Sequence, residues 1–429
     1  MYGEIIAIGD ELISGRVLNT TSTFVAYKLT LAGYSIRRIT VIGDNVSDIK
    51  ECLLASLKRS DFLIVTGGLG ATEDDITNEA VASALGLELE VRQELVKKIE
   101  ECGHRCDVAE GPYLEKMATV PKGAEILDID SYAAGYLLRY EGKVLFFLPG
   151  VPSQLKSHVE KQVIPRLQKL LGPGQLVLYK IFKIFGLGET EINKKLEFIE
   201  ADFSDVKIGY YPNFPEIHVA VTVTGSREKN NIEEIFESAC SAIRQTLDID
   251  IVAEDQDSLE TVLGNLLLDK KSALAVAESC TGGLVGQRIT SVSGSSGWFE
   301  CGAVTYSNKA KVKILGVSPK IIEQHGAVSE QTAHEMVEGV MRLGSVPFGL
   351  SLTGIAGPTG GTPEKPVGTV FIGMGTPEKI FVERFLFPGD RQEVRLLASE
   401  TALDWLRRYL KYGTDIPGYR PAKRLDQGH

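Results

Sequence analysis

The sequence predicts an α/β protein with a doubly wound N-terminal domain, a small α+β connector and a C-terminal α/β domain. Its 429 residues suggest about two to four domains at roughly 100–200 residues each. Short apolar runs alternate with segments of helical spacing and end in Gly or Asp turns, which is typical of βαβ units. Gly172-Pro173-Gly174 marks a boundary in this alternation. We place the domains at 1–171, 172–254 and 255–412, with a flexible tail at 413–429.

The N-terminal domain is predicted to hold a mostly parallel sheet. Its strands are expected at 4–8, 34–42, 61–66 and 143–148, and its helices at 19–32, at 47–59 and in a final segment reaching about Leu171. The first three strands end in Gly9-Asp10, Gly43-Asp44 and Gly67-Gly68. Ligands of such sheets bind beyond the carboxyl ends of the strands, so these turns predict a binding site.

The connector is predicted from strands at 176–184 and 218–224 and helices at 189–198 and 232–246. Its basic residues form no continuous stripe, and it lacks a GXXG loop between helices. RNA binding is therefore not expected.

The C-terminal domain is predicted to place Ser279 at a strand-to-helix junction. Its elements are expected as a helix at 259–268, a strand at 273–277, a helix from 281 to 289, a strand at 302–306 before a helix capped by Asn308, strands at 347–352 and 365–375, and a helix beginning at Arg391. Backbone N–H groups at the junction after 273–277 could stabilise an oxyanion beside Ser279.

Composition argues against several classes of function. The chain has 46 Lys and Arg against 57 Asp and Glu, a net charge of −11, and no cationic tract, so nucleic acid and anionic membranes are not expected partners. Six scattered cysteines favour a reduced cytoplasmic compartment. The chain opens directly into a strand-like segment instead of a signal peptide, and no run of about 18 apolar residues could cross a bilayer.

The segment CGHRC supplies Cys102, His104 and Cys106 as potential zinc ligands. It has no second Cys/His pair close in sequence, so an exposed helix-to-loop segment is the preferred interpretation.

The turn TGGLGATEDD at 66–75 predicts a nucleotide site in the N-terminal domain. Its glycines would let backbone amides approach a phosphate at a helix N-terminus. Asp74 and Asp75 would then hold a divalent metal or a sugar, or would simply cap the helix. The predicted nucleotide-binding residues are Asp10, Asn19, Asp44, Gly67, Gly68, Gly70 and Thr72.

Ser279 needs a base to act as a nucleophile. No histidine lies within forty residues of it, and the nearest downstream are His325 and His334, which could still complete a triad in space. A buried lysine of lowered pKa, Lys309 or Lys311, is the alternative, unless these lysines form a solvated first helical turn.

A further glycine-rich turn at 351–361 could bind phosphate or only reverse the chain. Arg391 could bind a phosphate or carboxylate, or pair with Asp390 or Glu393. These features indicate a nucleotide pocket without naming a reaction.

Three N-terminal motifs, GDELISGRVLNT (9–20), TGGLGATEDD and LPGVPSQ (148–154), resemble the molybdopterin-binding-like domain that opens CinA (competence/damage-inducible) proteins. The resemblance implies metal-dependent hydrolysis of ADP-ribose. The sequence departs from the family at Ala71, at Gln154 and in the loop 128–136, where proline, glutamate and an NxxGTAPG-type loop are usual. These departures favour a non-catalytic ligand-sensing or assembly module over a pyrophosphatase in this half.

The C-terminal blocks AESCTGG (277–283), GSSGWF (294–299), VTYSNKAK (304–311), HGAVS (325–329), TGIAGPTGG (353–361) and GDR (389–391) are similar to the C-terminal domain of the same family, a nicotinamide mononucleotide amidohydrolase. The resemblance implies Ser279 as nucleophile, Lys311 as general base, and Ser296 as a group that polarises the carboxamide. It implies that Tyr306 and Arg391 orient the substrate, with Arg391 as the partner of its phosphate. The implied substrate-binding residues are Thr281, Gly282, Gly283, Gly294, Asn308, Thr353, Gly354 and Arg391. No cofactor is needed in such a reaction, and a homodimer is implied.

Overall fold

The structure is a computed structural model that describes residues 1–106, 112–128, 135–225 and 231–413. The chain divides into two compact units, one of residues 1–178 with 224–232, and one of residues 179–223 with 233 onward. The connector and the C-terminal domain, predicted as separate domains, thus pack together in the second unit. Among the described residues no helix is long and apolar enough to cross a membrane.

The N-terminal domain is built on a six-stranded sheet with the strand order β2-β1-β3-β8-β7-β6. The four parallel strands that sequence periodicity predicts are β1 (Tyr2–Ile8), β2 (Ser35–Ile42), β3 (Phe62–Thr66) and β8 (Lys143–Leu148). Two antiparallel strands that were not predicted, β7 (Tyr136–Tyr140) and β6 (Glu125–Ile126), extend the sheet, and β4 (Leu89–Val91) pairs with β5 (Thr119–Pro121).

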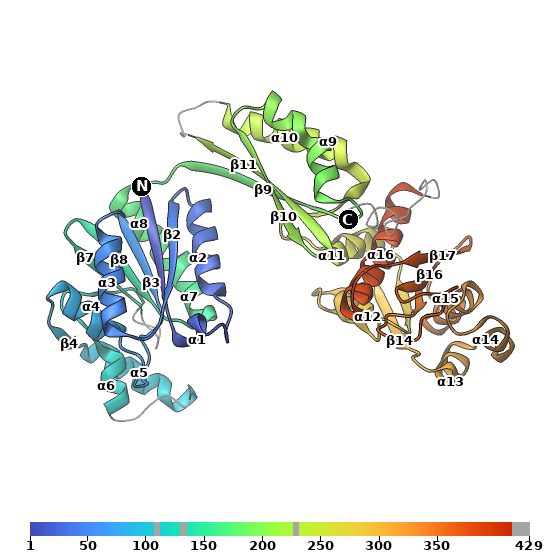
Figure 1. The fold of residues 1–429 in the computed structure, drawn as a ribbon, viewed down its shortest axis with the longest axis horizontal. Coiled ribbons are helices and arrows are strands. Elements are labelled where there is room, and N and C mark those ends of the chain that lie inside the picture. The colour runs from blue at the N-terminus through green and yellow to red at the C-terminus, as the bar shows by residue number, and fades with distance from the viewer. Residues whose placement is uncertain (107–111, 129–134, 226–230, 414–429) are drawn as a thin grey trace. The chain divides into compact units, whose positions relative to one another are not determined.

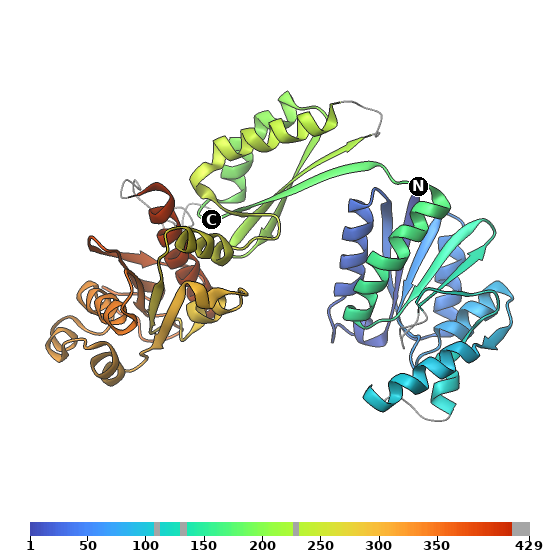
Figure 2. The same cartoon turned by 180° about the vertical axis from the view of Figure 1, so that it is seen from behind.

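Helices cover both faces of this sheet (Figures 1 and 2), as a doubly wound fold requires. One face packs on α3 (Val46–Leu57) and α4 (Thr77–Leu85), and the other on α2 (Thr20–Leu31), α7 (Pro152–His158) and α8 (Ile164–Leu171). Alternate residues of each strand supply the two cores, so that Leu63 faces one and Phe62 the other. The remaining elements are α1 (Asp10–Ile13), α5 (Gln93–Cys106), α6 (Pro112–Ala118) and the π-helical turn η1 (Val159–Val163).

The connector has the order β-α-β-β-α-β with the sheet β10-β11-β9-β12. Its elements are β9 (Leu176–Ile184), α9 (Glu189–Asp202), β10 (Val206–Asn213), β11 (Glu216–Gly225), α10 (Ile232–Leu247), the 3-10 turn η2 (Asp248–Asp250) and β12 (Ile251–Glu254). Strands β10 and β12 were not predicted, and α9 runs to Asp202 instead of ending at Phe198.

The C-terminal domain has a five-stranded sheet in the order β14-β13-β15-β16-β17. Strands β13 (Leu274–Glu278), β14 (Phe299–Val304) and β15 (Phe348–Gly354) are parallel, whereas β16 (Thr369–Gly375) and β17 (Ile380–Leu386) are antiparallel. The helices and helical turns are α11 (Leu259–Asp269), α12 (Leu284–Thr290), η3 (Ser295–Gly297), α13 (Asn308–Ala310), η4 (Lys311–Leu315), α14 (Pro319–His325), α15 (Glu330–Gly344) and α16 (Arg391–Tyr412).

One core of this domain joins α11, α12 and α16 to the sheet, and a smaller one lies under α15 on the other face. The mixed sheet keeps the carboxyl ends of β14, β13 and β15 together at one edge. That edge carries the candidate active site.

Candidate active site

Ser279 directly follows β13 at this edge of the C-terminal sheet. Its N–H donates to Leu352 O on β15 at 2.9 Å, and the chain then turns, with Gly282 N–H donating to Ser279 O at 3.1 Å. Gly282 and Gly283 have φ angles of +62° and +95°, which glycine adopts without a Cβ penalty. The predicted strand–turn–helix context is present, but the helix begins at Leu284 instead of Thr281 because the two left-handed residues intervene.

Lys311 is the basic residue that the fold brings to Ser279. Its Nζ lies 2.8 Å from Ser279 Oγ and 2.8 Å from Thr305 O. The Lys311 side chain is only 1% exposed, which is rare for a lysine. Burial lowers the pKa of Lys311, because desolvation disfavours the ammonium form. The pair therefore combines a hydroxyl with an amine that is easier to deprotonate than an ordinary lysine.

The segment leading to Lys311 is fixed by Ser307. Ser307 Oγ accepts a hydrogen bond from Ala310 N–H at 3.1 Å and caps α13, while Lys311 opens the π-helical turn η4. The prediction that Asn308 is the cap is wrong by one residue: Asn308 is the first helical residue and is exposed. The hydroxyl of Ser307 reaches the third N–H of the turn, which is the usual geometry of an N-cap.

The alternative bases lie elsewhere. His325, His334 and Lys309 are all exposed, and none of them contacts Ser279 within the described part of the chain. The carbonyl of His325 instead accepts a hydrogen bond from Lys365 Nζ at 3.2 Å. The structure thus pairs Ser279 with a lysine and not with a histidine.

Glu278 occupies the helix N-terminus that the sequence offered for an oxyanion. Its buried carboxylate accepts from Gly283 N–H, Val285 N–H and Gly286 N–H at 2.9, 3.1 and 2.9 Å. The expectation that these helix-terminal groups are free is therefore wrong. The N–H groups of Cys280 and Thr281 face the sulfur of Cys280 and have no oxygen acceptor among the described residues. Burial raises the pKa of the neighbouring Cys280 thiol to about 12, so it stays neutral.

Tyr306 and Arg391 meet at the same edge of the sheet. Arg391 Nη2 donates to Tyr306 Oη at 3.2 Å, and Nη1 donates to Gly357 O at 2.8 Å. Asp390 and Glu393 do not pair with Arg391, because together they form a capping box at the start of α16. Arg391 therefore has no carboxylate partner among the described residues, as a phosphate ligand requires.

Arg395 is a site residue that sequence reasoning missed. From one helical turn beyond Arg391 it donates Nε and Nη2 to Thr281 O at 3.1 and 2.6 Å. Thr281 is fully buried, and its hydroxyl has no hydrogen-bond partner in the described structure. The spacing of four residues from Arg391 was the available signal, since it places both arginines on one face of a helix.

Thr353 and Gly354 serve the architecture of the loops around the site. Thr353 Oγ1 donates to Ala327 O at 2.7 Å, which ties the segment 325–329 to the sheet. A Cβ on Gly354 would lie 2.6 Å from Thr369 O, so the close approach of β16 requires glycine.

Ser296 and Gly294 are not brought to Ser279 within the chain. Leu274 pairs with Phe299 and Glu278 with Val304, so the turn η3, which precedes Phe299, lies at the amino end of the strands. A strand of five residues separates the two ends by roughly 16 Å at about 3.3 Å per residue. Both residues are exposed.

A second site lies in the N-terminal domain, where a cavity of about 520 Å³ opens at the carboxyl ends of the parallel strands. The turns after β1, β2, β3 and β8 line it, as predicted from the doubly wound pattern. Of the predicted nucleotide-binding and metal residues, Asp44, Gly67, Gly68, Gly70, Asp74 and Asp75 line this cavity, and so does Gln154. Gly67 has a φ of +100°, and a Cβ there would lie 2.2 Å from Ile8 O.

Three predicted residues support the cavity without lining it. Asp10 and Asp44 exchange backbone-to-carboxylate hydrogen bonds at 2.9 and 3.1 Å, and Asn19 caps α2 through Ser22 N–H. Thr72 donates its N–H and hydroxyl to Asp75 Oδ2 at 2.9 and 2.5 Å. Asp75 therefore fixes its own loop, and α4 is capped by neither aspartate, since Ile76 stands at that position.

The cavity is acidic. Burial raises the pKa of Asp44, and the charges of Asp10, Glu11 and Asp74 act in the same direction. The described residues contain no group of three or more His, Cys, Asp or Glu side chains that could hold a metal ion. The loop 128–136, apart from its ends, and the side chains of Cys102, His104 and Cys106 lie outside the described residues, as does the predicted tail beyond Gly413.

The chain thus carries a buried serine–lysine pair on its C-terminal α/β domain and a carboxylate-lined cavity on its N-terminal α/β domain. Family models match the three parts of the chain: a probable molybdopterin binding domain at residues 4–169, a damage-inducible protein CinA KH domain at 179–253, and a CinA C-terminal domain at 256–410.

Relatives extend over nearly the whole chain. A CinA-like protein from Desulfotalea psychrophila is 44% identical over 410 residues, which are 95% of this chain and 98% of the relative. A putative competence-damage inducible protein from Thermoanaerobacter pseudethanolicus is 42% identical over 417 residues, 96% and 98% of the two chains. The chain belongs to the CinA family.

Similar solved structures each cover part of the chain. A competence/damage-inducible protein from Agrobacterium tumefaciens is 36% identical, covers 36% of this chain and 95% of its own, and has a TM-score of 0.34. The molybdopterin biosynthesis enzyme MoaB from Thermus thermophilus is 20% identical, covers 40% of this chain and 98% of its own, and has a TM-score of 0.28.

Proposed function

We propose that the protein hydrolyses the carboxamide of nicotinamide mononucleotide to nicotinic acid mononucleotide and ammonia, in pyridine nucleotide recycling in the cytoplasm. The observation that carries this proposal is the 2.8 Å contact between Ser279 Oγ and the buried amine of Lys311. Ser279 is the nucleophile and Lys311 its general base. No cofactor takes part.

A neutral amine suits this geometry. Lys311 can donate one N–H to Thr305 O and turn its lone pair toward the Ser279 hydroxyl. As Oγ bonds to the carboxamide carbon, Lys311 accepts the hydroxyl proton and the carbonyl electrons move to oxygen. Lys311 then gives the proton to the nitrogen, the C–N bond breaks, and ammonia leaves an acyl-enzyme. Water attacks the acyl carbon while Lys311 takes its proton. The C–Oγ bond breaks, and the proton returns to Ser279.

Residues of the site can be assigned to the oxyanion that forms in the reaction and to the phosphate of the substrate. The Cys280 and Thr281 N–H groups are the donors we assign to the oxyanion, since preorganised donors beside a nucleophile stabilise developing charge. Arg391 is assigned to the phosphate, and Tyr306 orients the nucleotide beside it.

Ammonia release from nicotinamide mononucleotide tests the proposal. Ser279→Ala is expected to abolish it, and Lys311→Ala to lower kcat by roughly 10²–10⁴-fold. Lys313→Ala, which alters an exposed lysine of the same turn, is the matched control and keeps the rate. Release that persists in Ser279→Ala would sink the nucleophile assignment.

We also propose that two chains pair along β14. This strand is the edge of its sheet among the described residues and exposes Val304, with Tyr306 beyond its end. Symmetric antiparallel pairing would place the η3 turn of each chain beside Tyr306 of the other, so Ser296 would act in the site of the second copy. Mixing inactive Ser279→Ala with Ser296→Ala should then restore part of the activity, and a monomer in sedimentation would contradict the pairing.

For the N-terminal cavity we propose a nucleotide ligand that binds with a divalent cation. Glu11, Asp44, Asp74 and Asp75 line it, and no lysine or arginine does so among the described residues. Because no three of these side chains form a metal-binding group by themselves in the described part of the chain, the cation would need the phosphate oxygens as further ligands. Calorimetry with ADP-ribose, with and without Mg²⁺, measures whether binding depends on the cation. Hydrolysis of ADP-ribose would indicate a pyrophosphatase, and binding without hydrolysis a sensing module. Asp74→Ala should weaken metal-dependent binding, whereas Glu51→Ala on exposed α3 should not.

A further inference from the structure

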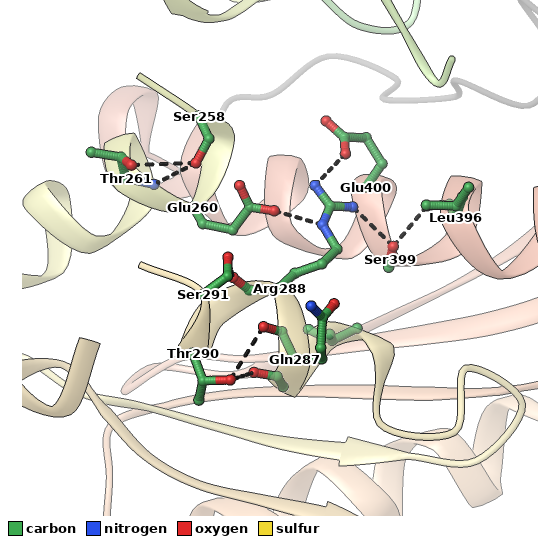
Figure 3. Close-up of polar contacts among 12 residues, drawn as sticks. Ser258, Glu260, Thr261, Gln287, Arg288, Thr290, Ser291, Leu396, Ser399 and Glu400 are labelled. Atoms are coloured by element: carbon green, nitrogen blue, oxygen red, sulfur yellow. Dashed lines mark hydrogen bonds and ion pairs between the residues drawn. The ribbon is translucent and has the colours of Figure 1, made fainter. Parts of the chain in front are cut away.

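The turn that carries Ser279, residues 279–283, joins two elements that are fixed by contacts of their own. Strand β13 before the turn lies between β14 and β15 in the sheet. Helix α12 after the turn is fastened by Glu278 at its first N–H groups and by Arg288 in its body (Figure 3). Arg288 donates to three side chains of α11 and α16, which are Glu260, Ser399 and Glu400. None of these contacts is made to the turn itself.

Arg395 of α16 reaches the turn from outside. It donates Nε and Nη2 to Thr281 O at 3.1 and 2.6 Å. A Cβ on Gly282 would lie 3.7 Å from its Nη2, so the guanidinium lies directly against the turn. No salt bridge of the described residues includes Arg395. Arginine usually binds a carboxylate or a phosphate, whereas here two of its donors converge on one peptide carbonyl.

This contact fixes one peptide group at both ends. The peptide between Thr281 and Gly282 donates its N–H to Ser279 O at 3.1 Å and accepts from Arg395 at its C=O. The Thr281 hydroxyl has no hydrogen-bond partner among the described residues, so it does not hold the turn. Gly282 and Gly283 have φ angles of +62° and +95°, and glycine adopts either sign of φ at little cost. Arg395 therefore selects one conformation of a turn that its glycines leave adaptable.

The conformation of the turn sets where the two oxyanion donors point. The N–H of Thr281 belongs to the peptide group directly before the one that Arg395 holds, and the N–H of Cys280 belongs to the peptide group before that. If the peptide between Thr281 and Gly282 rotated, its N–H would leave Ser279 O and the turn would open. Donors stabilise developing charge only while their positions are fixed, and a displacement of about 1 Å can lower a rate by about 10²-fold.

We propose that Arg395 is a positioning residue, which holds the Thr281 carbonyl so that the N–H groups of Cys280 and Thr281 stay aimed at the oxyanion formed at Ser279. The effect on ammonia release rests on the proposed amidase function, whereas the effect on the reactivity of the Ser279 hydroxyl does not. Arg391, one helical turn earlier, is assigned to the phosphate of the substrate. The two arginines should therefore differ in their kinetic effects, Arg395 acting on kcat and Arg391 on KM.

Steady-state ammonia release from nicotinamide mononucleotide tests this difference. Arg395→Ala should lower kcat by about 10–100-fold and leave KM nearly unchanged, because the lost hydrogen bonds hold the turn and not the substrate. Arg395→Lys, which keeps one cationic donor, should recover part of kcat. Gln392→Ala alters an exposed side chain in the first turn of α16 and, as the matched control, should keep both constants. A raised KM with an unchanged kcat in Arg395→Ala would make Arg395 a ligand of the substrate and overturn the proposal.

Phosphonylation of Ser279 by a fluorophosphonate gives a readout that does not need the amidase substrate. Ser279 Oγ bonds to phosphorus, the P–F bond breaks, fluoride leaves with the electron pair, and Lys311 takes the hydroxyl proton. Negative charge again develops on an oxygen beside the turn. Labelling followed by mass spectrometry of the full chain should be about 10–100-fold slower in Arg395→Ala than in the natural chain, and unchanged in Gln392→Ala. Equal labelling rates in all three chains overturn the proposal.

Urea unfolding separates positioning from a loss of the fold. It is followed by the fluorescence of Trp298 and Trp405, the two tryptophans of the chain, which both lie in the C-terminal domain. Arg395→Ala should remain folded in the absence of urea, because Arg288 still fastens α12 to α16. A fall in kcat that matches the unfolded fraction would contradict positioning, and if Arg395→Ala does not fold, Arg395→Lys takes its place in both rate measurements.

The two rate measurements also distinguish failure of the proposed function from failure of this inference. If the natural chain releases no ammonia but is phosphonylated at Ser279, the amidase function is wrong, and the labelling rates still decide the role of Arg395. A Ser279 that neither supports ammonia release nor reacts with the fluorophosphonate would overturn both proposals.

Discussion

At the scale of single residues, the burial of Lys311 makes its amine easier to deprotonate and lowers the stability of the fold where the amine is protonated. Burial lowers its pKa below 10.5, so between the lowered value and 10.5 the folded state binds fewer protons than the unfolded state. The contribution of Lys311 to stability therefore increases as the pH rises through that window.

Lys311→Met should remove this increase, because methionine fills a similar volume without a charge. Urea unfolding followed by tryptophan fluorescence between pH 7 and 10 should give a weaker rise with pH for Lys311→Met than for the natural chain. Lys313→Met, on the exposed side of the same turn, should keep the natural slope. Equal slopes for all three chains would show that Lys311 keeps an ordinary pKa.

Under the proposed function, the same shift in the pKa of Lys311 sets the pH at which the enzyme becomes active. The base works only as the neutral amine, so kcat should rise with pH through the lowered pKa of Lys311, below the range of an ordinary lysine. Lys311→Arg, which stays protonated, should be inactive throughout. A kcat that does not rise with pH anywhere below the range of an ordinary lysine would contradict Lys311 as the base.

Glu278 is the second residue on which the nucleophile turn depends. Glu278→Gln replaces one acceptor oxygen by an amide that faces the N–H donors of α12, and should destabilise the domain by about 1–3 kcal/mol. Glu383→Gln, at an exposed position of β17, is the control. The measurement is again urea unfolding by tryptophan fluorescence, and equal midpoints for both variants would rule out this role for Glu278.

At the scale of elements, the first turns of α16 present two arginines to the site. Arg391 reaches Tyr306 and Gly357, and Arg395 reaches Thr281. The capping box of Asp390 and Glu393 fixes where this helix begins, and hence where both guanidinium groups project.

Arg391→Ala should raise KM for nicotinamide mononucleotide by about 10–100-fold, since a hydrogen bond to a charged group contributes about 1.5–3 kcal/mol. For nicotinamide riboside, which lacks the phosphate, KM should change little. Steady-state ammonia release with both compounds makes the comparison, and an equal loss for both would place the phosphate elsewhere.

The buried strands and the turns at their carboxyl ends could be predicted from the sequence, because hydrophobic periodicity and glycine positions are local signals. Strand β17 and the helices α14 and α15 were not predicted, and the helix after Ser279 was started three residues early. Lys311 was predicted from the resemblance of the motif VTYSNKAK, and the structure places its amine beside Ser279. Glu278 and Arg395 could not be found, because their roles depend on contacts such as that of Arg395 with Thr281, 114 residues apart. Ser296 was assigned by resemblance to the family, and within one chain the structure places it at the opposite end of the strands from Ser279.

At the scale of the whole molecule, the connector and the C-terminal domain share buried charges. Asp404 of α16 accepts from Arg407 Nε and Arg408 Nε at 2.7 Å each, and these arginines reach Ile249 O and Asp250 Oδ1 of the connector. A helix of the C-terminal domain thus depends on the connector for hydrogen-bond partners of its buried arginines.

A fragment of residues 176–413 should therefore unfold like the full chain and keep the amidase rate. A fragment of residues 256–413 should lose about 1–3 kcal/mol, because Arg407 and Arg408 lose their hydrogen-bond partners Ile249 O and Asp250 and keep only Asp404. Urea unfolding of both fragments by tryptophan fluorescence gives the comparison. Equal stability would show that the connector is only a linker.

The carboxylate of Glu278 would also set the orientation of the proposed nucleotide substrate. A helix N-terminus beside a catalytic serine is ordinarily an attractive place for a phosphate, but at α12 that position is already taken by an anion that belongs to the protein. A nucleotide bound in the reverse orientation would place its phosphate beside the carboxylate of Glu278, and the two negative charges would repel each other. If the substrate is the proposed nicotinamide mononucleotide, we therefore expect its phosphate at the end of the site near Arg391 and its uncharged carboxamide beside Ser279.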